Sequence, residues 1–587
     1  MCASISATLP RTPTSPNSFC SRLDGDAGKA PNQFIVGPSV SGGLRVRVGT
    51  RTVLLSALLQ LLALTAAPAQ QPAPLDWTGL YIGYHTGGAL GLADVSNPFG
   101  PSIFGDTVRT PGPLAGGQLG YNWQRGASVL GVEADASWAD MDGTNTCFAY
   151  SGDYVSANCR AGIDALGTGA ARYGWILPFD RRTLLYGKAG LAFVHGDLKA
   201  KPNGGLGLGA KGGSSTQVGW TIGAGVERAI APRWTLKAEY GFLGFDDEGL
   251  TAPESQFQAA PPEGLLTSAA SARTHVSQDI HQFKLGMNYR LGGGSSAPAV
   301  ASTRPARGTE VEAGVRYVHG WGQFHKDLGI PRGGVTSLAS RLTYDNSDTN
   351  GAEAFARIDT AFGLMIKGLI GGAGGGGHMN DEDWAIDFPG ALIPYSNTLS
   401  GVDNDIRYWI ADIGYDVWRG RGYKIAPFIG YGEFRQDMAG LGCRQIANPF
   451  SDCGQPIPRS VVAIEEDDTW RALRLGAAAE MTVAPRLMLR GEAAYLPHVA
   501  FSGTDDHVLR ALVSPESGEG TGLQLEATLS YAVTDAFSLG VGGRYWSMWT
   551  TEGTVNFGGT GEIVPMRYAA EQAHLLVQGS YKFGAAR

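Results

Sequence analysis

Runs of about ten residues with alternating apolar and polar side chains recur along this chain from Asp76 to its end. In one run, Leu487 and Leu489 alternate with polar positions that include Arg490 and Glu492. Successive side chains of a β-strand point to opposite faces, so one face suits lipid and the other a polar interior. Many such runs separated by turn residues are typical of transmembrane β-barrels. The pattern therefore predicts an all-β fold.

The composition agrees with strands and argues against other classes of protein. The 587 residues include 86 glycines, 43% are hydrophobic and 17% are charged. This mixture is too apolar for a disordered chain, and each glycine would cost about 1 kcal/mol inside a helix. The net charge of −8 offers no dominant basic surface, so we expect no nucleic-acid partner.

The first 69 residues do not follow the strand pattern. Arg45, Arg47 and Arg51 precede the apolar run Val53–Ala66, and small residues follow at 67–69. This order is typical of a secretory signal peptide, and the run is shorter than the roughly 20 residues of a membrane-spanning helix. We expect residues 1–69 to be an N-terminal extension and signal peptide, with translation starting near residue 46. An uncleaved anchor is the alternative.

The first half of the remaining chain predicts an eight-stranded antiparallel transmembrane barrel over residues 76–291. Short turns are expected at 124–126, 180–182 and 231–233, and longer connections at 89–113, 139–160, 197–214 and 247–273. Outer-membrane barrels have short periplasmic turns and longer external loops, which orients the barrel.

A second, ten-stranded barrel is predicted over residues 309–587, after a flexible Gly-, Ser- and Pro-containing linker at 292–308. The expected strands lie near 309–321, 335–360, 363–372, 405–419, 423–438, 468–484, 486–502, 522–534, 537–551 and 566–583. The sequence thus predicts two transmembrane barrels in tandem, eight-stranded and then ten-stranded.

Four cysteines in this exported part form two close pairs. Cys147 and Cys159 are 12 residues apart, and Cys443 and Cys453 are 10 apart. An oxidising compartment favours two loop disulfides, whereas a metal site would need a different spacing.

Three strings in the first half are similar to small eight-stranded outer-membrane barrels of alphaproteobacteria. They are Trp77–Gly83, Gly131–Asp135 and Gly219–Gly225. The resemblance implies a mostly structural barrel without catalytic residues.

Two short acidic motifs in the second half are the candidate site. Asp381 and Asp383 follow the third expected strand, and Asp505 and His507 follow the seventh. Both strands are odd-numbered and end at the same rim, and each i, i+2 pair shares one face in extended chain. Strict alternation from Leu487 would point the second pair to lipid, unless a bulge near Pro497 or Gly503 shifts the register.

Both motifs resemble those of the omptin family of outer-membrane proteases. The resemblance implies that Asp381, Asp383, Asp505 and His507 are catalytic, with His507 as the general base for water and the Asp381 pair on the opposite wall. It implies an endopeptidase without metal or cofactor, with lipopolysaccharide as a possible activator. The partners would be polypeptide substrates, outer-membrane lipid and lipopolysaccharide, with the site facing the exterior.

The sequence departs from this family where a pocket for basic residues is expected. Gly503 takes one acidic position and Phe324 is aligned with another, so a pocket for small or apolar side chains is expected.

Other interpretations of the motifs stay open. Loop acids are most often solvated, and Asp381, Glu382, Asp383 and Asp387 could bind calcium, although the spacing lacks known loop features. The main alternative function is a non-catalytic structural or adhesion barrel with a decayed omptin-like half. A passive pore is disfavoured because interiors of this size are filled by side chains.

Overall fold

The computed structural model describes residues 75–583 apart from short gaps. The gaps are 151–154, 179–180, 203–209, 254, 259–265, 292–307, 333–334, 385–386, 389–390, 393–395, 421, 448–452 and 454. The expected signal peptide and nearly all of the expected linker lie outside the described residues. Among the residues described, no helix is both long enough and apolar enough to cross a membrane.

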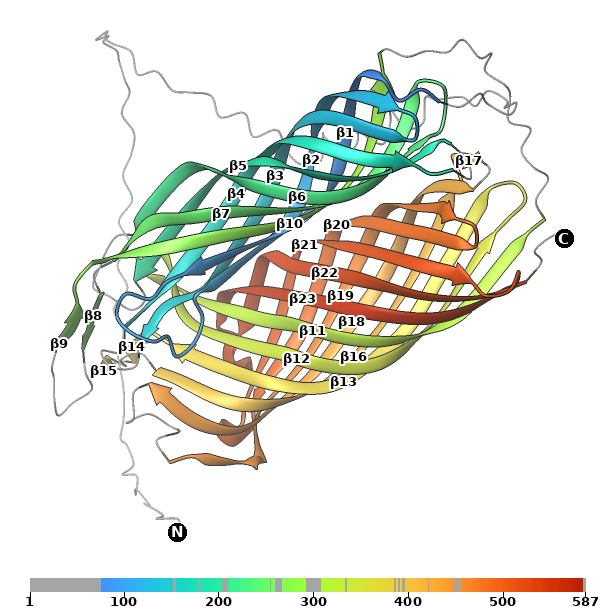
Figure 1. Cartoon of the computed structure of the whole chain (residues 1–587). Helices are drawn as coiled ribbons and strands as arrows, with labels where there is room; N and C mark the ends of the chain where they lie inside the picture. Colours follow the sequence, from blue (N-terminus) through green and yellow to red (C-terminus); the bar gives the residue numbers. More distant parts are fainter. Residues whose placement is uncertain are drawn as a thin grey trace, which may run out of the picture. The chain divides into compact units, whose positions relative to one another are not determined.

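The first sheet is a closed antiparallel barrel of eight long strands (Figure 1). They are β1 (Gly79–Val95), β2 (Thr107–Arg125), β3 (Ser128–Tyr150), β4 (Val155–Ile176), β5 (Thr183–Pro202), β6 (Lys211–Ala229), β7 (Trp234–Ala252) and β10 (Ala272–Arg290). Each strand pairs with its sequence neighbour, except that β8 (Ser255–Gln258) and β9 (Leu266–Ala269) form a separate hairpin between β7 and β10. The pairing of β1 with β10 closes the ring.

The second sheet contains ten long antiparallel strands, drawn from yellow-green to red in Figure 1. They are β11 (Glu310–Arg332), β12 (Val335–Asp359), β13 (Leu364–Asp383), β16 (Ser396–Tyr415), β18 (Tyr423–Ala447), β19 (Ile457–Ala484), β20 (Leu487–His507), β21 (Leu512–Ala532), β22 (Phe537–Asn556) and β23 (Ile563–Phe583). β11 pairs with β23 and β16 pairs with β18, so each long strand has a partner on both sides. The short pieces are β14 (Asp387–Phe388), β15 (Ala391–Leu392), β17 (Trp418–Gly420) and the 3-10 helices η1 (Val508–Arg510) and η2 (Phe557–Gly559).

The all-β class, the number of long strands and the positions of the short turns agree with the sequence-based prediction. The predicted ends of the strands were wrong on the side of the long loops. The third expected strand of the second half was placed at 363–372, but β13 continues to Asp383. Most residues expected in long loops of the first barrel are likewise paired. Backbone hydrogen bonds between strands continue beyond the stretch with apolar side chains. The strand ends could not be predicted there, because the prediction used only the alternation of apolar and polar side chains.

Both predicted disulfides are present, Cys147–Cys159 and Cys443–Cys453. The placement of the first in a loop was wrong. Cys147 lies in β3 and Cys159 in β4, where Cys147 pairs with Ala157 in the strand register. The bond therefore joins two adjacent strands near their ends.

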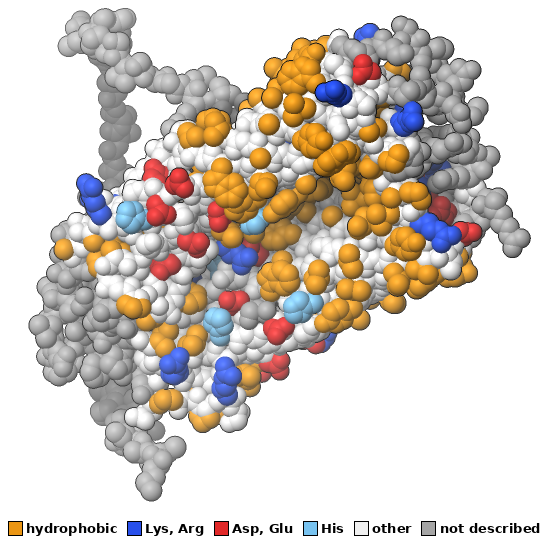
Figure 2. Space-filling view, viewed as in Figure 1, with side chains coloured by type: hydrophobic (Ala, Val, Ile, Leu, Met, Phe, Trp, Pro, Cys, Tyr) orange, Lys and Arg blue, Asp and Glu red, His pale blue; other side chains and the backbone are white. Residues whose placement is uncertain are grey.

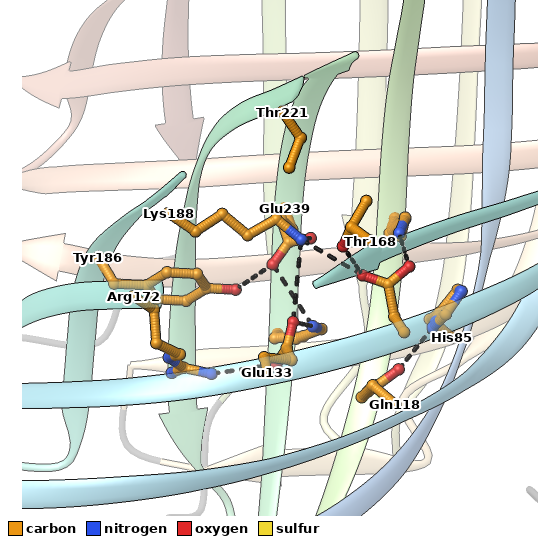
Figure 3. A network of polar contacts seen from close by, with 12 residues as sticks. His85, Gln118, Glu133, Thr168, Arg172, Tyr186, Lys188, Thr221 and Glu239 are labelled. Atoms are coloured by element: carbon orange, nitrogen blue, oxygen red, sulfur yellow. Dashed lines mark hydrogen bonds and ion pairs between the residues drawn. The ribbon is translucent and has the colours of Figure 1, made fainter. Parts of the chain in front are cut away.

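The interior of the first barrel is filled by a charge-matched network (Figure 3). Its four acids are Glu133, Asp135, Glu227 and Glu239, and its four bases are Arg172, Lys188, Lys237 and Lys284. Each acid has at least one basic partner, for example Lys237 Nζ 2.8 Å from Glu133 Oε1. Buried charges are tolerated when they are paired and hydrogen-bonded. These buried and paired side chains therefore fill the middle of the interior.

The lower interior of the second barrel is matched in the same way. Its seven acids are Glu312, Glu353, Asp359, Asp412, Glu480, Glu492 and Glu526, and its seven bases are Arg316, Arg357, Lys367, Lys424, Arg474, Arg490 and Arg544. Arg474 Nε, for example, lies 2.9 Å from Asp412 Oδ1.

The outer surface of the second barrel changes from apolar to charged along each strand. On β16 and β18 the exposed aromatics Trp409 and Tyr431 are followed, toward the candidate site, by the exposed Arg407 and Arg435. Aromatic residues mark the edges of the membrane, and exposed ion pairs belong in water. Figure 2 shows hydrophobic side chains gathered over one stretch of the visible surface and charged side chains over another. The strands therefore continue beyond the apolar band, and the candidate site lies in that part.

Candidate functional site

A bulge in β20 turns the second motif into the barrel. The register shifts between Leu496 and Val499, with one extra residue in β20 relative to β19. Pro497 cannot donate a hydrogen bond to the ladder, which makes this a natural place for the irregularity. Even-numbered residues of β20 face the interior before the bulge, and odd-numbered residues face it after the bulge. Asp505 and His507 therefore point inward. The bulge considered from the sequence is confirmed at Pro497.

Asp505 and His507 form a close pair at the end of β20. His507 Nε2 lies 3.3 Å from Asp505 Oδ2, and the His507 side chain keeps 18% of its surface exposed. Burial alone would lower the pKa of His507, but the hydrogen bond and charge of Asp505 outweigh it, so the pKa is raised above its ordinary value. Burial opposes ionisation of Asp505, yet Lys326 and His507 hold the pKa of this carboxyl well below its usual range.

The first motif lies at the end of β13, on the opposite side of the interior. Met365 and Met379 on this strand are buried in the interior. Asp381 and Asp383 are separated from them by even numbers of residues, as side chains on the same face of a strand are. The glycine-rich stretch between them carries no register shift against β16, so alternation is kept through it. Asp381 and Asp383 therefore also face inward, and both are half-buried.

The two motifs are electrostatically linked. Burial and then the neighbouring charge of Asp383 raise the pKa of Asp381 to about 8. The other groups acting on Asp381 are His507, Arg510 and Asp505, which come from β20 and η1. The four predicted site residues are thus brought into one electrostatic neighbourhood. At neutral pH this arrangement offers a protonated carboxyl on one wall and an imidazole held by a carboxylate on the other.

Sequence reasoning missed Lys326 on β11. Its ammonium lies 2.7 Å from Asp505 Oδ2, the same oxygen that His507 approaches. Phe324 was assigned to a specificity position at this strand end, and that placement was wrong. It is fully buried beside Tyr344 and Phe501, with ring centroids 5.9 and 6.4 Å away. Phe324 and Lys326 are two residues apart on β11 and so face the same side of the strand. This spacing was the signal in the sequence from which an inward-facing Lys326 could have been predicted.

The geometry does not favour the calcium loop considered for the first motif. Glu382 lies between Asp381 and Asp383 in an extended strand, so its carboxylate points to the opposite face of β13. Asp387 belongs to β14, which pairs only with β15 among the described strands. Glu382 therefore does not share a face with Asp381 and Asp383, on which one ion could be held.

Comparison with known families and proteins concerns mainly the first barrel. The family model described as "Outer membrane protein beta-barrel domain" matches residues 59–260. The 31 kDa outer-membrane immunogenic protein of Brucella melitensis is 31% identical over 252 residues, covering 40% of this chain and 94% of the relative. The 22 kDa outer membrane protein of Rhizobium leguminosarum is 32% identical over 196 residues, covering 32% of this chain and 75% of the relative.

Two solved structures are similar at low identity. The outer membrane protease OmpT from Escherichia coli has a TM-score of 0.40 and 15% identity, covering 47% of this chain and 97% of that chain. Ail, the attachment invasion locus protein of Yersinia pestis, has a TM-score of 0.19 and 13% identity, covering 36% of this chain and 99% of that chain.

Proposed function

Since this chain belongs to the outer membrane β-barrel family and is an outer-membrane protein, we propose that its second barrel is a surface endopeptidase. The barrel hydrolyses polypeptides by water that Asp505 and His507 activate, with Asp381 and Asp383 on the facing wall. The site opens to the cell exterior, on the side of the long connections. The first barrel is a structural outer-membrane domain with a packed interior.

One observation carries this proposal: two motifs 124 residues apart place their side chains in one neighbourhood above the apolar band. His507 can accept a proton from water once its imidazole is neutral, and Asp505 at 3.3 Å stabilises the imidazolium that forms. Asp381, whose pKa is raised to about 8, can donate a proton to the developing oxyanion at neutral pH. These steps use no covalent intermediate.

The side chains around the site argue for small or apolar residues at the cleaved bond. Gly503 contributes no acid, and Lys326 adds a positive charge beside Asp505. A basic substrate side chain entering here would meet that ammonium. We propose that the site disfavours Lys and Arg at the cleaved bond. We also propose lipopolysaccharide as an activator, in line with the omptin resemblance.

A non-catalytic structural or adhesion barrel is the second candidate. The observation that favours it is the bond between Lys326 and Asp505, because this ammonium competes with His507 for the same carboxylate oxygen. A carboxylate shared in this way stabilises an imidazolium less well than one that serves the imidazole alone. The packed interiors of both barrels argue against a third candidate, an open pore.

Cleavage of a mixed peptide library by the full refolded chain with lipopolysaccharide tests the proposal. Asp505→Asn and His507→Ala are compared with the parent, and Asp506→Asn is the matched control because its side chain points to the other face. We expect the parent and the control to cleave, and His507→Ala to lose about 100-fold or more. Cleavage that survives both changes rejects the mechanism. A parent that never cleaves supports the structural candidate.

A further inference from the structure

The two buried charge networks described above contain equal numbers of acids and bases, whereas a third cluster among the described residues does not. Four acids face four bases in the first barrel, and seven face seven in the lower second barrel, as described above. Beneath the Asp505–His507 pair, four acidic side chains are grouped with a single ammonium. They are Glu466 and Asp468 of β19, Asp505 of β20 and Glu516 of β21, and the ammonium of Lys326 is ion-paired with all of them except Asp468. With every carboxyl ionised, these five charges would sum to −3.

Lys326 is ion-paired with only one oxygen of each of three carboxylates. Its ammonium lies 2.5 Å from Glu466 Oε2, 2.7 Å from Asp505 Oδ2 and 3.0 Å from Glu516 Oε1. The second oxygens, Glu466 Oε1, Asp505 Oδ1 and Glu516 Oε2, have no hydrogen-bond partner other than a neighbouring carboxyl among the described residues. Buried oxygens without a partner are costly, so a further cationic group is expected on that side of the cluster.

Asp468 and Tyr344 give a second, separate indication. Asp468 is fully buried, and apart from the neighbouring carboxyl of Glu466 its oxygens have no hydrogen-bond partner among the described residues. Tyr344, on β12, is also fully buried, and its hydroxyl has no hydrogen-bond partner in the described part of the chain. The charged groups that act on the Tyr344 hydroxyl are Glu466, Lys326, Asp505 and Asp468, so it lies near the cluster.

We propose that Glu466, Asp468 and Glu516 bind one divalent cation of the calcium class beneath the candidate catalytic pair. One oxygen from each lies within 4.8 Å of the others. Two oxygens on the same calcium ion can be up to about 5.2 Å apart, twice the usual bond length. The donors are all oxygens, which suits calcium or magnesium rather than zinc or copper.

The cation completes the charge balance of this region. With every carboxyl ionised, the cation would change the sum of the cluster from −3 to −1, and an imidazolium at His507 would bring it to zero. The ligands lie on β19 and β21, the two neighbours of β20, so the ion braces the strand that carries Asp505 and His507. No metal is needed in the proposed hydrolysis, and the ion does not contact the reacting water.

Calorimetric titration with calcium chloride tests the site on the full chain, refolded in detergent without lipopolysaccharide and stripped with a chelator. We expect one equivalent to bind, and Asp468→Asn to weaken binding at least tenfold. Asp467→Asn is the matched control, because this neighbouring acid is exposed on the outer face. Absence of binding, with the surplus charge held by protons, overturns the proposal. Binding that is lost in the control but not in Asp468→Asn overturns it too.

A second measurement covers the case in which Asp468→Asn does not fold. Terbium replaces calcium, and its luminescence is excited through Trp470, which lies two residues from Asp468 on the same face of β19. We expect luminescence from the parent that calcium displaces and that Glu516→Gln reduces. Luminescence unchanged by Glu516→Gln would contradict the site. Neither measurement requires peptide cleavage, so this result and that of the proposed protease are independent.

Discussion

At the scale of single residues, protonation decides whether the four side chains of the candidate site can work together. His507 acts as a base only when neutral, and Asp381 acts as an acid only when protonated. Asp505 raises the pKa of His507, whereas burial and Asp383 raise that of Asp381 to about 8. The useful pH window therefore lies between the raised pKa of His507 and about 8.

We expect kcat/KM for peptide cleavage to follow a bell-shaped pH profile. Activity rises as His507 loses its proton and falls above about pH 8 as Asp381 loses its own. Asp383→Asn removes a negative charge that raises the pKa of Asp381, so the alkaline limb moves to lower pH. An alkaline limb that stays in place in Asp383→Asn would show that another group causes it.

Lys326 should control the acidic limb of the same profile. Its charge lowers the pKa of His507, so Lys326→Met raises that pKa and shifts the acidic limb to higher pH. The change also leaves Glu466 and Glu516 without their base, and we expect a loss of about 3–5 kcal/mol in unfolding free energy. Denaturant unfolding and a histidine NMR titration measure the two effects. Lys326→Arg, which keeps the charge, serves as the control.

At the scale of elements, the bulge in β20 sets which side chains reach the interior. Arg490 and Glu492 point inward below it, and Asp505 and His507 point inward above it. Because the side-chain period of a strand is two, the one extra residue changes the inward-facing positions from even to odd numbers for the whole following segment.

Deletion of His498 tests this dependence. It removes the extra residue of β20 and makes Leu496, Pro497 and Val499 consecutive, so regular alternation keeps Val499, Asp505 and His507 facing inward. We expect the barrel to form and cleavage to be retained, because the pairing partners on β19 and β21 remain available. Heat-modifiable migration in gels reports the barrel, and His498→Ala is the control. Loss of cleavage in a folded deletion variant would show that the bulge itself is needed, and not only the facing of the side chains.

At the scale of the whole molecule, two interiors are filled by matched charges, and one region above the apolar band is not. Packed ion pairs close the interior of each barrel at membrane depth, as in the bond between Arg544 and Glu353 at 2.6 Å. The unmatched carboxylates lie beside the candidate catalytic pair. Function is therefore expected at the water-exposed end of the second barrel rather than along its axis.

The full chain should not conduct small solutes through its barrels. We expect liposomes containing the refolded chain to swell no faster than empty liposomes in a sugar uptake assay, because side chains fill both interiors. Arg544→Ala removes a packed base and is the comparison. Rapid swelling with the unchanged chain would contradict the packed interiors and favour a pore.

The sequence by itself determined the strand class, the short turns, both disulfide pairs and the two motifs of the candidate site. These features depend on alternation, turn residues and spacing, which are local properties of the chain. Only the tertiary structure decided how far β13 and β20 extend, how Pro497 reverses the facing of Asp505 and His507, and that Lys326 meets Asp505. Register and cross-barrel contacts join residues far apart in sequence, so hydrogen bonding between strands and packing inside the ring select them, and no local pattern records that choice.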